Sequence, residues 1–159
     1  MAQKVQNLVI HCLATKDGVE VKGSDVIKWH TDKPPKGNGW KVPGYTDIIH
    51  LNGGVERLVE NNEDSIVDPW EVTNGAAGHN SVSRHVAYVG GLDEKGKPKD
   101  TRTEGQHKAL KKYVLDFLRT NPDAKVVGHY QLNPGKECPC FNVPNWLRFI
   151  GVAEKNIMA

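Results

Sequence analysis

Residues 8–13 read LVIHCL, and this short apolar stretch decides the fold class. A run of six residues that is apolar on both faces is typical of a strand buried inside a sheet. Residues 85–89 (HVAYV) and 125–129 (KVVGH) are similarly short and apolar. The sequence therefore predicts three buried strands of a central sheet.

The longest helix is predicted over residues 104–120. Apolar side chains recur there at helical spacing, and Thr103 with Gln106 forms the capping-box pattern that precedes a helix. A last short helix is expected over residues 143–150. Because these helices alternate with the strands, the predicted fold class is α/β, with helices on the faces of the sheet.

Shorter elements complete the predicted order. Ser24 is the expected N-cap of a short helix that ends before residues 34–35 (PP). Residues 48–59 predict a hairpin, because the Asn52-Gly53 pair supplies the positive φ that a tight turn needs. Residues 61–83 are expected to form one long loop, and a loop of that length inside a compact domain is usually functional.

The composition fits a single domain over residues 1–159, with its core at about residues 8–150. Hydrophobic residues make up 38% and charged residues 25%, which excludes a disordered chain. A net charge of +2 is too balanced to indicate nucleic acid or a membrane surface as the partner. No apolar run approaches the roughly 18 residues of a transmembrane helix, and the N-terminal run is too short for a signal peptide. We therefore expect synthesis in the cytoplasm without an export signal.

Three residues are candidates for a metal site. His11 lies within an apolar strand, His129 at the end of another, and Cys138 in the segment KECPCF. Two imidazoles and one thiolate suit Zn²⁺, and three protein ligands leave a fourth position for water, as in catalytic zinc sites. The residues alone leave other interpretations open, namely His11 as a core histidine bonded to a backbone carbonyl and Cys138 as a small buried hydrophobe.

The other two cysteines are expected to play no part in metal binding. Cys12 neighbours His11 on a strand, so its side chain points to the opposite face and packs in the core. Cys140 follows Cys138 by two residues and is the alternative fourth ligand, but a fourth protein ligand would close the site to water. An odd number of cysteines also argues against a disulfide framework.

Short segments spread along nearly the whole chain match one family in their order and spacing. They are residues 9–12 (VIHC), 39–40 (GW), 44–45 (GY), 53–55 (GGV), 78–80 (GHN), 89–91 (VGG), 127–129 (VGH) and 134–141 (PGKECPCF). The sequence resembles the zinc-dependent N-acetylmuramoyl-L-alanine amidases, a superfamily that includes phage lysozymes of the amidase type and the animal peptidoglycan recognition proteins. This resemblance implies a mixed central sheet of about five strands flanked by helices, with one zinc ion at the floor of an open cleft.

The resemblance also implies roles for individual residues. The implied zinc ligands are His11, His129 and Cys138. The implied catalytic residues are Tyr45, which would orient water or move a proton, and Lys136, whose charge would stabilise the oxyanion. The residues expected in the substrate groove are His30, His79, Asn80 and His85. The implied reaction is hydrolysis of the amide bond between the lactyl group of N-acetylmuramic acid and L-alanine.

Three places depart from the family pattern. Thr46 stands where many members have a histidine after the tyrosine, and Gly75 stands where many have a histidine before an alanine. Arg84 and His85 stand where phage members have Ile-Gly. His85 is therefore expected either as an extra polar contact in the groove wall or as a surface histidine on an edge strand.

Other functions stay open at the level of the sequence. Members that bind peptidoglycan without cleaving it typically lack the ligand cysteine, so Cys138 argues against a pure binding module. Recycling amidases that act on soluble muropeptides normally have an aspartate at that position. Binding to RNA polymerase, a property of some phage amidases, is supported by no residue of the chain. The expected partner is bacterial peptidoglycan or its fragments, reached through a holin-type pore or an effector secretion route.

Overall fold

The strand predicted over residues 8–13 lies inside a mixed five-stranded sheet in the computed structural model, which describes residues 2–158. The spatial order of the strands is β5 (Val55–Arg57), β4 (Asp47–Ile49), β7 (Ser83–Tyr88), β2 (Asn7–Cys12) and β9 (Lys125–Gly128). The β4–β5 hairpin is antiparallel and the other three pairings are parallel. The predicted α/β class, the mixed sheet and the hairpin are confirmed.

Four α-helices accompany the sheet in the described part of the chain. They are α1 (Gly23–Thr31), α2 (Glu104–Thr120), α3 (His129–Leu132) and α4 (Val143–Phe149). The bounds of α2 match the prediction, and both halves of the Thr103–Gln106 capping box are formed. Among residues 2–158 no helix has the length and apolar character needed to cross a membrane.

Short elements fill the connections between the main strands. They are β1 (Gln3–Lys4), β3 (Thr15–Lys16), β6 (Ile66–Val67), β8 (Gly91–Leu92), η1 (Pro69–Glu71), η2 (Asn80–Val82) and η3 (Glu154–Asn156). Strand β6 and the 3-10 helix η1 lie within the segment expected as one long loop, and β6 pairs with β1. That segment is therefore partly ordered by pairing with the N-terminus.

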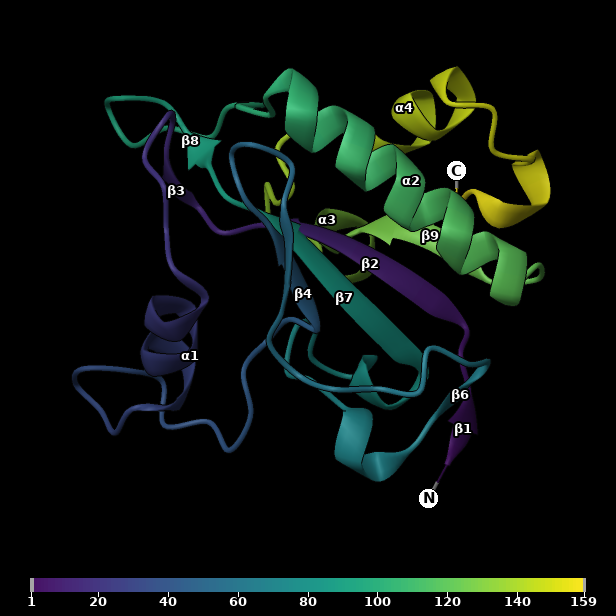
Figure 1. The fold of residues 1–159 in the computed structure, drawn as a ribbon, viewed down its shortest axis with the longest axis horizontal. Coiled ribbons are helices and arrows are strands. Elements are labelled where there is room, and N and C mark those ends of the chain that lie inside the picture. Colours follow the sequence, from purple (N-terminus) through teal and green to yellow (C-terminus); the bar gives the residue numbers. More distant parts are fainter. Residues whose placement is uncertain (1, 159) are drawn as a thin grey trace.

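The two faces of the sheet carry different layers, because side chains alternate along each strand. Leu8, Ile10 and Cys12 of β2 belong to the main core, together with buried residues of α2 and α4. The opposite face packs against α1 through a smaller cluster that includes Val26 and Ala87. Figure 1 shows α2 running across one side of the sheet and α1 to the left of β4. His11, which alternates with Ile10 and Cys12, therefore points away from the main core.

The start of α1 differs from the prediction. Its N-cap is Lys22 rather than Ser24, and no side chain of the helix caps it. The Glu56 carboxylate of β5 instead accepts a hydrogen bond from the Gly23 N–H at 3.2 Å. The helix thus begins two residues earlier than predicted, at Gly23, because a partner from a distant strand satisfies its first free N–H group.

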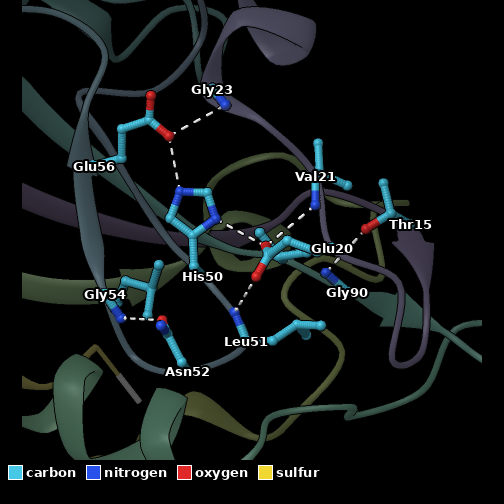
Figure 2. Close-up of polar contacts among 12 residues, drawn as sticks. Thr15, Glu20, Val21, Gly23, His50, Leu51, Asn52, Gly54, Glu56 and Gly90 are labelled. Carbon is cyan, nitrogen blue, oxygen red and sulfur yellow. Dashed lines mark hydrogen bonds and ion pairs between the residues drawn. The ribbon is translucent and has the colours of Figure 1, made fainter.

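The same carboxylate belongs to a cluster that ties α1 to the hairpin (Figure 2). Both ring nitrogens of His50 lie 2.8 Å from carboxylate oxygens, Nδ1 from Glu20 and Nε2 from Glu56. Burial by itself lowers the pKa of His50, but the hydrogen bonds and charges of Glu20 and Glu56 outweigh it, so this pKa lies above its usual value of 6.5. A protonated ring, which has two N–H donors, matches this arrangement.

His50→Gln is expected to remove a pH-dependent part of the stability. A raised pKa in the folded protein means that protonated His50 stabilises the fold below about pH 6.5, and that this contribution is lost as the pH rises through the folded pKa. The free energy of unfolding, measured by urea titration, should therefore differ most between parent and variant near about pH 5.5 and least near about pH 8.5. An equal difference at both pH values would contradict the charged pairing.

Candidate metal centre

Three side chains from distant parts of the chain converge at one end of the sheet. His11 lies in β2, His129 is the first residue of α3, and Cys138 lies in the loop before α4. One ligand atom from each of the three lies within 4.8 Å of the other two. Nδ1 of His11 is 3.7 Å from Sγ of Cys138. The expected ligand set is therefore brought together by the fold.

The parallel pairing of β2 and β9 explains why the two histidines meet. Ile10 lies opposite Gly128 in the register, so His11 and His129 follow at the same level beyond the carboxyl end of β9. Their ring centroids are 4.6 Å apart. In sheets with parallel strands, sites form at the carboxyl ends because the chain leaves the sheet there in loops.

The hydrogen bonds around the three residues leave one donor atom of each free to face the centre. Nε2 of His129 lies 2.9 Å from Oδ1 of Asn133, which leaves Nδ1. Nε2 of His11 is likewise engaged, by Nδ1 of His85, which leaves Nδ1 of His11. The Cys138 sulfur accepts a hydrogen bond from the Cys12 N–H at 3.1 Å, which fixes the side of the sulfur that faces away from the centre. A tetrahedral zinc ion holds such donors about 3.3–3.8 Å apart. The His11–Cys138 distance of 3.7 Å lies in this range, and the three donors are all within 4.8 Å of one another.

Both imidazoles are electrostatically suited to bind a cation. Burial, followed by the neighbouring histidines, holds the pKa of His11 well below its usual value. Burial also lowers the pKa of His129, and the positive charge of Lys136 adds to this, although Asn133 acts in the opposite direction. The neutral imidazole is the form that binds a metal, so neither ring needs to lose a proton near neutral pH.

The other two cysteines contact each other rather than the centre. Sγ of Cys12 lies 3.8 Å from Sγ of Cys140, and Cys12 packs in the main core with 3% of its surface exposed. Contact with Cys138 raises the pKa of the Cys12 thiol to about 12, so it stays protonated. Among the described residues, Cys140 is not one of the converging donors.

Tyr45 lies beside the centre, as expected. Its ring centroid is 5.0 Å from that of His11 and 5.2 Å from that of His30. His30, at the end of α1, accepts a hydrogen bond from the Gly44 N–H at 2.9 Å, and its ring packs at a tilt against Trp40. His30 therefore supports the backbone that carries Tyr45. Burial, followed by the electrostatic effect of the nearby Cys138 and Cys12 side chains, raises the pKa of Tyr45, so its hydroxyl remains a donor.

The second expected catalytic residue, Lys136, and two of the expected groove residues lie at other points around the centre. Lys136 is exposed on the loop before Cys138, and its charge reaches His129. Asn80 and His79 are partly exposed at the start of η2, and Oδ1 of Asn80 accepts a hydrogen bond from the Ala76 N–H at 2.9 Å. The Asn80 side chain thus closes the loop of residues 76–80 on itself.

His85 does not lie on an edge strand, and the interpretation as a surface histidine is wrong. Strand β7 lies between β4 and β2, and the His85 side chain has no exposed surface. Its Nδ1 instead lies 2.8 Å from Nε2 of His11. Sequence reasoning also missed Asn133, although its spacing of four residues after His129 places the two side chains on one turn of a helix.

No protein-family model matches the chain, but individual proteins do. An endolysin of Enterobacteria phage K11 is 32% identical over 146 residues, which cover 92% of this chain and 87% of that protein. The similarity therefore extends over nearly the full length of both proteins.

Two solved structures share the fold at lower identity. The Ph2119 endolysin of a Thermus scotoductus bacteriophage superimposes with a TM-score of 0.71 and 21% identity, over 95% of this chain and 87% of that one. The N-acetylmuramoyl-L-alanine amidase LysC of Clostridium intestinale gives a TM-score of 0.71 and 18% identity, over 94% and 87%. At these identities the two matches establish a common architecture.

Proposed function

The chain belongs to the phage endolysin family, and from that premise we propose that it cleaves peptidoglycan as a zinc-dependent N-acetylmuramoyl-L-alanine amidase. The observation that carries the proposal is the convergence of His11, His129 and Cys138 within 4.8 Å of one another. The donor set leaves room for water, as in a catalytic zinc site and unlike a closed structural one. The shared fold with LysC agrees with amide hydrolysis as the reaction.

The three ligands would hold the ion and leave the reacting groups to other side chains. When bound, zinc supplies a water of pKa about 7 and polarises the carbonyl of the amide bond. Tyr45, with its hydroxyl protonated and its ring against His11, would orient the attacking water by a hydrogen bond. Lys136 would place a positive charge where the oxyanion develops.

The substrate is proposed to lie over the partly exposed residues around the centre. His79 and Asn80 at η2 would contact the stem peptide or the sugar on one side. On the other side, the rings of His30 and Trp40 pack together next to Tyr45. We assign the site of action to the cell wall, which the protein would reach after release through a holin-type pore or an effector route.

The decisive experiment is mass spectrometry of the products from intact sacculi, with and without a zinc chelator. The amidase reaction is expected to release peptides with a free L-alanine amine and glycan strands with intact lactyl groups, and the chelator should stop it. Cleavage within the glycan or within the stem peptide would overturn the assignment. Binding without any cleavage would indicate a recognition module, and cleavage confined to soluble muropeptides would indicate a recycling enzyme.

A further inference from the structure

Two buried histidines form a hydrogen bond behind the candidate metal centre. Nε2 of His11 lies 2.8 Å from Nδ1 of His85, with 1% and 0% of the two residues exposed. Nδ1 of His11 is the atom that faces Cys138, so the hydrogen bond engages the opposite side of the same ring. The second nitrogen of His85, Nε2, has no hydrogen-bond partner among the described residues.

The strand register places the two rings in contact. In the parallel pairing of β2 and β7, Val9 lies opposite His85 and His11 lies opposite Ala87. The two histidines are therefore diagonal neighbours on one face of adjacent strands, the face that points away from the main core. Their ring centroids are 5.0 Å apart.

The loop before η2 is shaped around the His85 ring. A Cβ atom on Gly75 would overlap Nδ1 of His85, and it would also lie 2.7 Å from the Gly44 carbonyl oxygen. The sheet thus supplies the imidazole, and the glycine at position 75 leaves the space that the imidazole occupies.

We propose that His85 is a positioning residue for the metal ligand His11, because its Nδ1 accepts the Nε2–H of His11 and so fixes the tautomer whose Nδ1 lone pair points at the metal. This inference rests on the proposed zinc site. Metal-binding histidines generally donate their second N–H to a carboxylate, a carbonyl or a water, and removing such a partner typically costs 10- to 100-fold in metal affinity. Here the acceptor is Nδ1 of another imidazole, which the register of β2 and β7 holds 2.8 Å from Nε2 of His11.

The test compares two substitutions of His85 that distinguish the loss of its hydrogen-bond acceptor from the loss of its side-chain volume. His85→Leu fills a similar volume without an acceptor, whereas His85→Asn keeps an oxygen near the position of Nδ1. Zinc affinity is measured by competition with a chromogenic chelator, and the melting temperature of the zinc-free protein reports folding. We expect about 10- to 100-fold weaker zinc binding for the Leu variant, and a smaller loss for the Asn variant. Equal affinities for the Leu variant and the parent would overturn the inference.

A second measurement needs no substitution and so does not depend on a variant folding. Long-range ¹H–¹⁵N NMR spectra of the zinc-free protein are expected to show the proton on Nε2 of His11 and none on Nδ1 of His85. A proton on Nδ1 of His85 would overturn the inference even if the parent binds zinc and releases L-alanine amines. If the parent binds no zinc, both the inference and the proposed function fail.

Discussion

Cys138→Ser is expected to lose bound zinc and peptidoglycan hydrolysis together, whereas Cys140→Ser keeps both. The serine hydroxyl is a poor replacement for a thiolate ligand, and the sulfur of Cys138 lies 3.7 Å from Nδ1 of His11. The loss of turnover should be roughly a thousandfold or more, because a bound metal supplies several kcal/mol of transition-state stabilisation and each 1.4 kcal/mol is tenfold. Metal content by mass spectrometry and turbidity loss of purified sacculi provide the measurements.

Cys140→Ser is a matched control because it makes the same chemical change two residues away. The Cys140 sulfur contacts Cys12 at 3.8 Å and is not among the converging donors. His129→Ala should repeat the double loss of zinc and lysis from another element of the fold. Normal turnover by Cys138→Ser, or loss of zinc from Cys140→Ser, would reject the ligand assignment.

Gln106→Leu is expected to lower the free energy of unfolding by about 3 kcal/mol, because it leaves buried backbone groups without partners. Gln106 is fully buried, and its Nε2 donates to the Ile49 and Val89 carbonyl oxygens at 3.2 and 2.9 Å. Its Oε1 accepts from the Thr103 N–H at 2.9 Å. The side chain therefore joins the start of α2 to the ends of β4 and β7, while leucine fills the same space without any of these bonds.

The matched control for Gln106→Leu is Lys108→Leu on the exposed face of the same helix. That change keeps helix propensity and should alter stability by less than about 0.5 kcal/mol. Urea titration of both variants, with unchanged m-values, gives the comparison. If Gln106→Leu unfolds at the same urea concentration as the parent, the buried hydrogen bonds contribute no net stability.

Local sequence signals predicted the elements that depend on local interactions. Helix α2 is set by the spacing of its apolar residues and by Thr103 with Gln106, all within one segment of the chain. Ser24 failed as an N-cap because the partner of the first helical N–H, Glu56, comes from another strand. A propensity rule that uses neighbouring residues contains no information about such a partner.

The residues alone suggested a metal site but left other interpretations open, because the three candidates are remote along the chain. Spacing did not link His11 to His129, whose segments are brought together by the pairing of β2 with β9. The prediction of His85 as a surface residue of an edge strand was wrong for a similar reason. Its burial follows from the strand order β4-β7-β2, and a single strand does not reveal its neighbours.

The absence of a side chain at Gly75 also limits which residues can be exchanged in this region. Any residue with a Cβ at position 75 would overlap the His85 ring, so the loop or the imidazole would have to move. A smaller residue at position 85 would instead leave an unfilled hole next to His11. A mutant library that varies only one of the two positions therefore samples a crowded or a vacant site, and compatible pairs are found only when both vary together.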